Sequence, residues 1–265
     1  MGGSATTLRD IAERAGVSIS TVSRALNGSL GVKPDVAERI RRIAAEINYT
    51  PNLLGRNLRL NIDPDFGPDF SRRQAQNFRE KQVIAAAAAQ LCTPNAIIAL
   101  DSGSTVLQLA AYLPQHVVVY TNSLALLQTL SKRQITTYLT GGLYIPEMAA
   151  VFGPEAEEYA HTHPTEWYFL SASRIDVHAG LYNVNPLTTG VKKAWIQNAR
   201  RVALVADHSK FVDSAINAFV PLTVIDVLIT DYVPGPYETL IAQQIPHIIQ
   251  IQRDSNETSA RKESS

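Results

Sequence analysis

Beyond residue 79 the chain alternates between short apolar runs, typical of buried strands, and longer stretches with apolar residues at helical spacing. This alternation predicts a largely parallel sheet with helices on both faces. The predicted strands cover residues 96–100, 117–120, 136–139, 167–171, 202–205 and 224–229. The predicted helices cover residues 79–91, 105–112, 124–130 and 191–199.

The N-terminal part has a different pattern, because residues 7–27 predict two short helices joined by a tight turn. Thr7 can cap the first helix, Gly16 lets the backbone turn where that helix stops, and Ser18 can cap the second helix. A third helix is predicted after Pro34, since apolar residues recur at helical spacing between residues 36 and 47. This arrangement is typical of a helix-turn-helix, whose second helix lies in the DNA major groove.

Charge and composition divide the chain in the same way. Residues 1–60 contain nine Lys and Arg against five Asp and Glu, a net charge of +4, whereas the whole chain is neutral and the remainder is therefore −4. A basic module on an acidic body is typical of a tethered DNA binder. Pro, Gly and Asp are frequent after residue 60. We expect a DNA-binding headpiece with hinge helix over residues 1–59, a linker over 60–78, an α/β domain over 79–252 and a disordered tail over 253–265.

The N-terminal segment resembles the DNA-binding headpiece of the lac-repressor (LacI) family through T-L-R-D-I-A-E-R-A-G-V-S-I-S-T-V-S-R-A-L-N. The later run N-Y-T-P-N-L-L-G-R-N-L-R resembles the family's hinge helix, which forms over the minor groove. By this resemblance Ile19, Ser20 and Arg24 read bases, and Arg24 can bond the O6 and N7 edge of guanine. The DNA-binding residues that the resemblance implies are Thr7, Leu8, Ser18, Ile19, Ser20, Thr21, Ser23, Arg24, Asn27, Asn52, Arg56 and Leu58.

The hinge departs from the family at one position. Leu58 matches the leucine that wedges between base pairs, and Pro51 suits the first turn of a helix. Gly55 stands where the family usually has alanine, and glycine costs about 1 kcal/mol of helix stability. Whether the hinge forms a helix without DNA stays open at this point.

Polar loops follow five successive predicted strands, at residues 101–105, 121–123, 141–142, 171–176 and 206–210. Ligands bind beyond the carboxyl ends of the strands in sheets of this kind. The first loop runs through Gly, Ser and Thr into a helix, which is the pattern of an anion site. A single loop of this composition is usually only a turn, but five at successive strand ends predict a ligand site.

These loops resemble the sensor domain of the DeoR family of sugar-catabolism repressors. The matching residues are L-D-S-G-S-T, Y-T-N-S-L, T-G-G, F-G-P, A-S-R-I-D, G-L, V-K-K-A, V-A-D-H-S-K-F and I-D-V-L-I-T-D, between residues 81 and 249. The resemblance implies a fold related to ribose-5-phosphate isomerase and a phosphorylated sugar or sugar derivative as effector. The chain is thus interpreted as a small all-α helix-turn-helix domain joined to an α/β sensor domain.

The same resemblance assigns roles to individual residues. Ser102, Gly103, Ser104 and Thr105 hold the phosphate. Asp101 and Asn122 border the site, Asp176 binds sugar hydroxyls, and Lys210 pairs with the phosphate or an anomeric oxygen. Lys192 either adds charge to the site or is a solvated surface lysine. The other ligand-binding residues expected from these loops are Ser123, Gly141, Gly142 and Asp207.

A missing carboxylate bears on the activity. The DeoR family typically has a glutamate a few residues before the lysine that matches Lys192, and residues 185–191 contain none. Because proton abstraction beside a carbonyl needs a positioned base, we expect no enzyme. The expected function is a DNA-binding regulator of carbohydrate metabolism, most simply a repressor. Two alternatives stay open, a sugar-phosphate isomerase-like enzyme and a DNA-binding regulator whose α/β domain serves only oligomerisation.

Apolar runs, cysteine and histidine content limit the location and the chemistry expected of the protein. Without an apolar run of eighteen residues or a signal-peptide pattern, we expect a bacterial cytoplasmic protein associated with the nucleoid. The single Cys92 excludes an intrachain disulfide. The six histidines form no ligand cluster, so we expect neither a metal nor a cofactor. The expected partners are pseudo-palindromic operator DNA, a phosphorylated sugar and further copies of the chain in a homodimer or tetramer, with no membrane.

Overall fold

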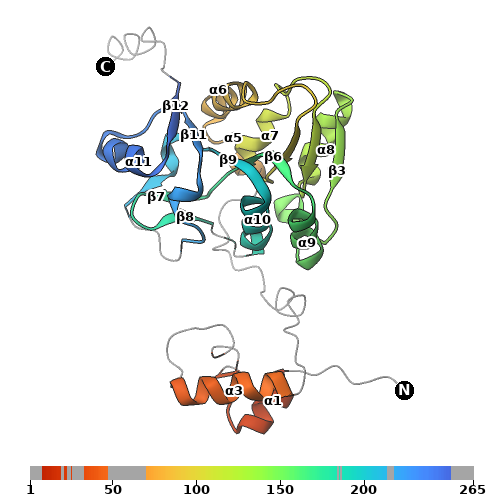
Figure 1. Ribbon diagram of the computed structural model, residues 1–265, viewed down its shortest axis with the longest axis vertical. Coiled ribbons are helices and arrows are strands. Elements are labelled where there is room, and N and C mark those ends of the chain that lie inside the picture. Colours follow the sequence, from red (N-terminus) through yellow and green to blue (C-terminus); the bar gives the residue numbers. More distant parts are fainter. Residues whose placement is uncertain are drawn as a thin grey trace. The chain divides into compact units, whose positions relative to one another are not determined.

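A computed structural model describes residues 8–18, 21–22, 25, 33–46, 70–183, 185, 187–213 and 218–251. The chain divides into two compact units, Met1–Asn61 and Ile62–Ser265. Both are drawn in Figure 1. The exact domain boundaries stay a prediction.

The N-terminal unit has a helical core of small and branched side chains. Helix α1 (Leu8–Ala15) ends at Gly16, whose φ of 60° is the left-handed conformation that suits glycine. The backbone N–H of Thr21 donates to Ser18 Oγ at 3.2 Å, so Ser18 caps the following turn as predicted. Helix α3 (Pro34–Glu46) packs on α1. Its buried residues join those of the first two helical segments in one core: Ile11, Ala12, Ala15, Val22, Ala25, Ala37, Ile40, Ile43 and Ala44.

The second unit is built on a seven-stranded sheet with the order β12-β11-β9-β6-β1-β2-β3 (Figure 1). Every neighbouring pair in it is parallel. The strands are β1 (Ile97–Leu100), β2 (Val118–Thr121), β3 (Thr136–Leu139), β6 (Thr165–Leu170), β9 (Ala199–Val205), β11 (Val227–Thr230) and β12 (His247–Gln250). The predicted fold class is confirmed, because a parallel sheet with helices on its faces is what the alternating pattern indicates.

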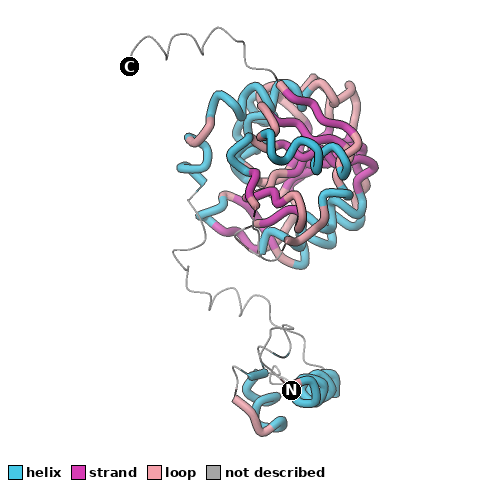
Figure 2. The backbone as a smooth tube through the Cα atoms, turned by 90° about the vertical axis from the view of Figure 1, so that its left-hand side faces the viewer, coloured by secondary structure: helices cyan, strands magenta, loops and turns pink. Residues whose placement is uncertain are grey.

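Helices cover both faces of this sheet, as Figure 2 shows. One apolar cluster lies between the sheet and helices α6 (Phe78–Ala89), α7 (Ser104–Leu109) and α8 (Leu124–Lys132). The other lies between the sheet and helices α9 (Pro154–Thr162), α10 (Leu187–Asn198) and α11 (Glu238–Gln244). Cys92 is buried in the first cluster, and burial raises the pKa of its thiol to about 12.

Smaller elements surround the main sheet. A three-stranded sheet has the order β10-β7-β8, and β4 pairs with β5. Their bounds are β4 (Leu143–Ile145), β5 (Ala150–Phe152), β7 (Arg174–Asp176), β8 (Gly180–Tyr182) and β10 (Phe211–Val212). Short 3-10 turns cover Pro146–Met148, His208–Lys210, Leu222–Val224 and Gly235–Tyr237. The prediction that a strand begins at residue 224 is wrong, because that residue ends a 3-10 turn and β11 begins at Val227.

Two further differences concern helices. Helix α10 begins at Leu187 and not at residue 191, since Asn185 Oδ1 accepts the Leu187 N–H at 2.9 Å and starts the helix earlier. Helix α5 (Phe70–Ala75) lies inside the range predicted as linker, and its first residue, Phe70, is buried. Phe70 anchors this otherwise polar helix, and the composition of the range did not indicate it.

Candidate functional site

The order of the strands shows where the chain connection changes direction in the main sheet. From β1 the chain continues to β2 and β3 on one side, whereas from β6 it continues to β9, β11 and β12 on the other. The connection therefore reverses direction between β1 and β6. In open parallel sheets the crevice at the carboxyl ends of such strands is where ligands bind.

Buried polar side chains gather at this carboxyl edge. They follow β1, β2, β3, β6, β9 and β11, and they include most of the residues expected in the ligand site. Burial of this many polar groups is costly unless they are paired or serve a ligand. The buried members are Asp101, Ser102, Ser104, Thr105, Thr121, Asn122, Ser123, Thr140, Asp176, Asp207, Thr230 and Asp231, together with Lys81 and Lys192 from helices.

The centre of the edge is an ion pair between Asp101 and Lys192. The Lys192 ammonium donates to Asp101 Oδ2 and, at 2.8 Å, to the backbone carbonyl of Ser171. The Ser171 backbone N–H donates to the same carboxylate oxygen at 3.0 Å, and its hydroxyl does so as well. Burial lowers the pKa of Lys192 below the ordinary value for lysine, although the charge of Asp101 opposes that shift. Lys192 is therefore a buried member of the site and not a solvated surface lysine.

Gly103 lets the loop after β1 lie on the loop after β6. A Cβ added at Gly103 would come within 1.9 Å of Ser171 Oγ and 2.5 Å of Ser171 Cβ. No larger residue fits there without moving Ser171. The close approach explains why glycine stands at this position beside the Asp101 carboxylate.

A second polar centre lies around Asp207, after β9. Its Oδ1 accepts hydrogen bonds from Asn77 Nδ2 at 2.8 Å, from the Ser209 N–H at 3.1 Å and from the Ser209 hydroxyl. Burial acts to raise the pKa of Asp207, but these bonds and the charge of Lys210 outweigh it, so the pKa lies below the ordinary value. Asp207 Oδ2 is buried without a hydrogen-bond partner in the described part of the chain. This oxygen can accept a hydrogen bond from a ligand.

Lys81 belongs to the same centre and was missed by the sequence reasoning. Its side chain is 1% exposed, and its ammonium donates to the backbone carbonyl of Arg73. Burial lowers the pKa of Lys81 to about 8, with Asp207 acting to raise it and Lys210 and Arg73 acting to lower it further. The signal was present in the sequence, because Lys81 shares its helix face with Ile84, Ala85 and Ala88.

Cationic side chains come close together at this edge. Arg73 and Lys210 are close enough to Lys81 to lower its pKa, and Arg73 also lowers the pKa of Lys192. The carboxylates listed above, Asp101, Asp176, Asp207 and Asp231, lie at the same edge, so its charges are mixed. Burial is the largest cause of both lowered lysine pKa values, and the neighbouring cations add to it. An anionic ligand can pair with these cations.

Other predicted residues at the edge have structural partners. Asn122 Nδ2 donates to the Val151 carbonyl at 2.9 Å and joins the end of β2 to β5. Ser123 donates its backbone N–H to Thr121 Oγ1 at 3.0 Å. Gly142, with φ of 127°, lies against the Phe152 backbone, where a Cβ would come within 2.6 Å of the carbonyl oxygen, and Gly141 is exposed beside it. These bonds shape the loops around the two charged centres.

Asp176 lies in the small sheet and not between the lysines. Its Oδ1 accepts the N–H groups of His178 at 2.8 Å and Ala179 at 2.9 Å, which form the turn from β7 to β8. Its charge acts on the pKa of Tyr237. The predicted contact of Asp176 with sugar hydroxyls stays a prediction.

His208 fixes the loop that carries Asp207 and Lys210. Its backbone N–H donates to Asp231 Oδ1 at 2.8 Å, and its Nδ1 lies 2.6 Å from Asp231 Oδ2. Its ring also stacks on Tyr232, with centroids 4.6 Å apart. The loop after β9 is thereby held to the end of the neighbouring strand β11.

In the N-terminal unit, the described residues define the scaffold of the predicted DNA-binding surface. Arg39 of α3 donates to the Ala15 carbonyl at 2.8 Å and so holds α3 to the C-terminal end of α1. Ser18 and Thr21 lie at the start of the second helical segment. Only the backbone of Leu8 is described. The predicted contacts at Thr7, Ile19, Ser20, Ser23, Arg24, Asn27, Asn52, Arg56 and Leu58 lie outside the described residues.

Within the described residues, no group of three or more His, Cys, Asp or Glu could hold a metal ion. No helix in that part of the chain is long and apolar enough to cross a membrane.

An α/β unit with a cationic carboxyl edge, joined to a helical unit with a helix-turn-helix scaffold, defines a protein with one ligand-binding part and one DNA-binding part. The family models agree with this division. Residues 76–232, more than half of the chain, match the DeoR C-terminal sensor domain, and residues 7–52 match the bacterial regulatory proteins of the lacI family. The chain belongs to the DeoR family through its sensor domain and carries a helix-turn-helix of the LacI type. Both predicted resemblances are confirmed.

Curated relatives match over part of their length. The uncharacterised HTH-type transcriptional regulator YulB of Bacillus subtilis is 32% identical over 61% of this chain and 64% of its own length. The L-fucose operon activator of Haemophilus influenzae is 30% identical over 64% of this chain and 70% of its own length. The chain thus spans less than two thirds of YulB. These relatives are named as regulators and not as enzymes.

Among solved structures, the chain is similar to ribose 5-phosphate isomerase A from Methanocaldococcus jannaschii. The identity is 17%, over 52% of this chain and 56% of that chain, and the TM-score is 0.40.

Proposed function

We propose that this protein is a DNA-binding transcriptional regulator of carbohydrate metabolism, most simply a repressor, controlled by a phosphorylated sugar or sugar derivative. The DNA-binding headpiece and hinge occupy residues 1–59, a linker extends to residue 78, the sensor domain covers residues 79–252, and a tail follows. The chain acts on pseudo-palindromic operator DNA as a homodimer or tetramer.

The cationic side chains at the carboxyl edge are the observation that carries the proposal. Arg73 and Lys210 act on the pKa of Lys81, Arg73 acts on that of Lys192, and Lys210 acts on that of Asp207. A phosphate group bears up to two negative charges and several acceptor oxygens, so it can pair with these cations. Ser102, Gly103, Ser104 and Thr105 supply donors beside it.

Asp207 Oδ2 has no hydrogen-bond partner among the described residues, and this observation favours a ligand that contains a sugar. A buried carboxylate oxygen gains stability when it accepts a hydrogen bond, and hydroxyl groups of a sugar donate such bonds. Asp176 and Asn122 supply further polar groups toward the rim of the site.

In the headpiece, the bases are contacted by Ile19, Ser20 and Arg24. Helix-turn-helix proteins read two half-sites as a symmetric pair of subunits. The effector alters DNA binding to the extent that it binds the DNA-competent and incompetent arrangements with different affinities.

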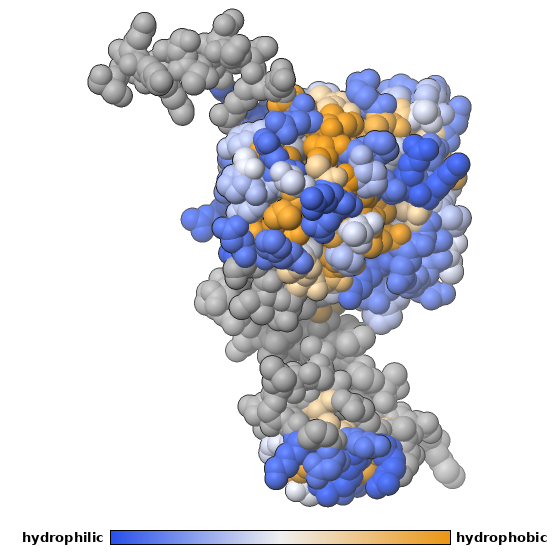
Figure 3. Space-filling model, turned by 60° about the vertical axis from the view of Figure 1, so that its left-hand side comes forward, coloured by the Kyte–Doolittle hydropathy of each residue, from blue (hydrophilic) through white to orange (hydrophobic). Residues whose placement is uncertain are grey.

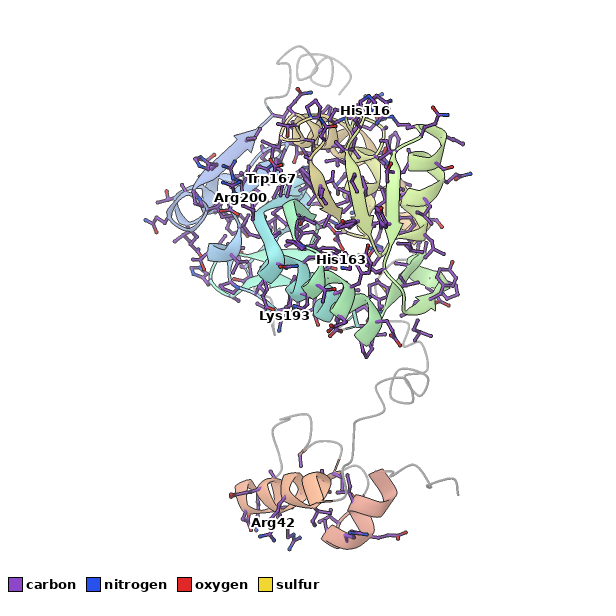
Figure 4. All side chains as sticks on the ribbon, turned by 45° about the vertical axis from the view of Figure 1, so that its right-hand side comes forward. Arg42, His116, His163, Trp167, Lys193 and Arg200 are labelled. Carbon is purple, nitrogen blue, oxygen red and sulfur yellow. The ribbon has the colours of Figure 1, made fainter. Side chains whose placement is uncertain are left out.

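A thermal-shift panel of sugars, sugar phosphates and sugar acids tests the proposal. A ligand at 100 times its dissociation constant adds about 2.7 kcal/mol of stability. One phosphorylated compound is expected to stabilise the wild type and Lys193→Ala, but not Lys210→Ala. Lys193, labelled in Figure 4, is an exposed lysine next to Lys192 and serves as the matched control.

The same compound is then added to the protein bound to operator fragments selected from random DNA. A change in affinity for the selected sequence, without a change for random DNA, would support regulation by the effector. Stabilisation by unphosphorylated sugars alone would contradict the phosphate assignment. Equal binding of selected and random DNA would contradict the sequence-specific headpiece.

A further inference from the structure

Strand β3 is an edge strand of the main sheet (Figure 1), so one of its sides has no neighbouring strand among the described residues. The Thr140 N–H donates to Thr121 of β2 at 3.0 Å. In a parallel ladder every second residue bonds to the same neighbour. Thr136 and Tyr138 therefore face β2, whereas the backbone groups of Thr137 and Leu139 point outward. In the part of the sheet that the structure describes, those outward groups have no backbone partner.

Natural sheets protect such edges with charges, proline, bulges or a covering element. Strand β3 reads Thr-Thr-Tyr-Leu and contains none of these protecting residues. The preceding Arg133 does not guard the edge, because its guanidinium donates to the carbonyls of Ala110 at 2.8 Å and Leu113 at 2.6 Å. The backbone of β3 is therefore available to another strand.

Two of the four side chains of β3, those of Tyr138 and Leu139, are large, apolar and exposed. Tyr138 is 52% exposed and Leu139 is 38% exposed. Tyr138 packs edge-on against Tyr120, with ring centroids 5.4 Å apart, and Tyr120 in turn contacts Tyr159 and His163 of the α9 region. Figure 4 brings this side of the unit forward, with His163 labelled. Apolar residues also reach the surface on the face shown in Figure 3. Strand β12 forms the other edge of the sheet, but its apolar residues Ile248 and Ile249 are only partly exposed, whereas Tyr138 and Leu139 of β3 are exposed.

We propose that β3 pairs antiparallel with β3 of a second copy of this chain, so that the two seven-stranded sheets continue across a twofold axis at Tyr138. This inference rests on the proposed function, because a helix-turn-helix reads its half-sites as a symmetric pair. A twofold interface uses the same surface on both subunits. Because β3 is uncharged, it lies beside its own copy without like-charge repulsion. In this pairing Thr137 lies opposite Leu139 of the partner subunit.

The charges around β3 favour the antiparallel direction. Lys132 ends helix α8, just before β3, and is exposed. Glu155 is exposed beside Gly141, just after β3, where a Cβ added at Gly141 would lie 3.7 Å from Glu155 Cβ. Antiparallel pairing turns the basic end of each strand toward the acidic end of the other. Opposite charges arranged in this way steer association and fix its register.

The pairing makes a geometric prediction for cysteine cross-linking. Both backbone groups of Tyr138 point toward β2, so two Tyr138 residues on the axis form a non-hydrogen-bonded pair, with Cα atoms about 4.5 Å apart. That spacing lies within the range of a disulfide. The two Leu139 residues, one from each subunit, lie two positions apart along the paired strands. The distance between their Cα atoms is therefore too long for a disulfide. Cys92 is buried and does not interfere.

The experiment uses the full-length chain and its Tyr138→Cys, Leu139→Cys and Val83→Cys variants under mild oxidation. Val83 is an exposed apolar residue on α6, a helix that packs under β9 and β11 and away from β3. A cross-linked dimer on non-reducing gels is expected for Tyr138→Cys, and little or none for the other two. Equal cross-linking of all three variants, or none at Tyr138→Cys, overturns the proposal.

A second measurement does not depend on cysteine. Tyr138→Lys places two like charges opposite each other, which is expected to weaken self-association by about 100-fold or more. Sedimentation should show a smaller species for Tyr138→Lys and an unchanged one for Val83→Lys. If Tyr138→Lys keeps the wild-type size, or if the wild type is a monomer, the proposal is wrong. Effector-induced thermal shifts of Tyr138→Lys report on the proposed function separately, since the site residues are untouched.

Discussion

Lys192 of helix α10 donates a hydrogen bond to the Asp101 carboxylate after β1, although the two residues are 91 positions apart in the chain. Both side chains are buried, and Ser171 after β6 contacts each of them. Ser171 thus links this ion pair to the end of β6, so the contacts join the ends of the two strands between which the chain reverses direction. It lies where a ligand in such a sheet would bind.

Breaking this pair from one side should be costly. Asp101→Asn leaves the Lys192 ammonium buried without its counter-charge, which is expected to lower the free energy of unfolding by about 3–5 kcal/mol. Lys192→Met combined with Asp101→Asn removes the stranded charge, so the double variant should be more stable than Asp101→Asn alone. Urea denaturation of the two single variants and the double variant measures the coupling. Strictly additive losses would show that the two residues do not act as a pair.

Gly103 should tolerate no side chain unless Ser171 is changed. Gly103→Ala is expected to destabilise the protein by about 1–3 kcal/mol, because its Cβ overlaps Ser171 Oγ and Cβ. Ser171→Gly removes both atoms and should recover much of that loss in the double variant, whereas Ser171→Ala should not. Thermal unfolding of the variants checks this. A mild effect of Gly103→Ala in the wild-type background would mean that the two loops lie further apart.

The pH dependence of stability should report on Lys81. Its pKa of about 8 in the folded protein lies below its ordinary value of 10.5. Between those values the unfolded chain therefore binds more protons, and stability due to Lys81 rises with pH. Relative to Lys81→Met, the wild type should gain up to about 3 kcal/mol between pH 7.5 and pH 10.5. Urea denaturation at several pH values tests this, and a difference that does not change with pH would contradict it.

The headpiece assignment predicts a specific loss at one base pair. Arg24→Ala should cost about 1–3 kcal/mol on the selected operator and relax the preference at one position. Exposed Arg42 of α3 is not among the assigned base-reading residues, so Arg42→Ala is the control. Binding to a panel of single-base operator variants measures the effect. An equal loss on selected and random DNA would show that Arg24 contacts only phosphate.

Local patterns in the sequence predicted much of the fold. The bounds of β3 agree at both ends, and the turn at Gly16 with the cap at Ser18 was predicted, because glycine and serine act through their own backbone neighbourhood. The small strands β7, β8 and β10 were not predicted. Each has two or three residues and depends on pairing with distant segments, so it has no pattern of its own.

The site was predicted only in outline. The loops after the strands were found because the carboxyl ends of parallel strands must meet at one edge. Lys81 was missed because a lysine on a helix is normally solvated, and only the packing of α6 on the sheet buries it. Helix α5 lies in a stretch rich in polar residues, proline and glycine, and the burial of Phe70 that anchors it is visible only in the structure.

The sequence by itself determined the two units, the helix-turn-helix pattern, the parallel sheet and the edge that carries the polar loops, because each follows from the spacing of residues along the chain. The tertiary structure alone decided that Lys192 pairs with Asp101, that Lys81 joins the cationic group, and that β3 lies at an edge of the sheet. It also decided that, among the described residues, one oxygen of Asp207 has no hydrogen-bond partner. These relationships depend on which strands become neighbours. That choice is made by the burial of apolar surface over the whole domain, which no local spacing encodes.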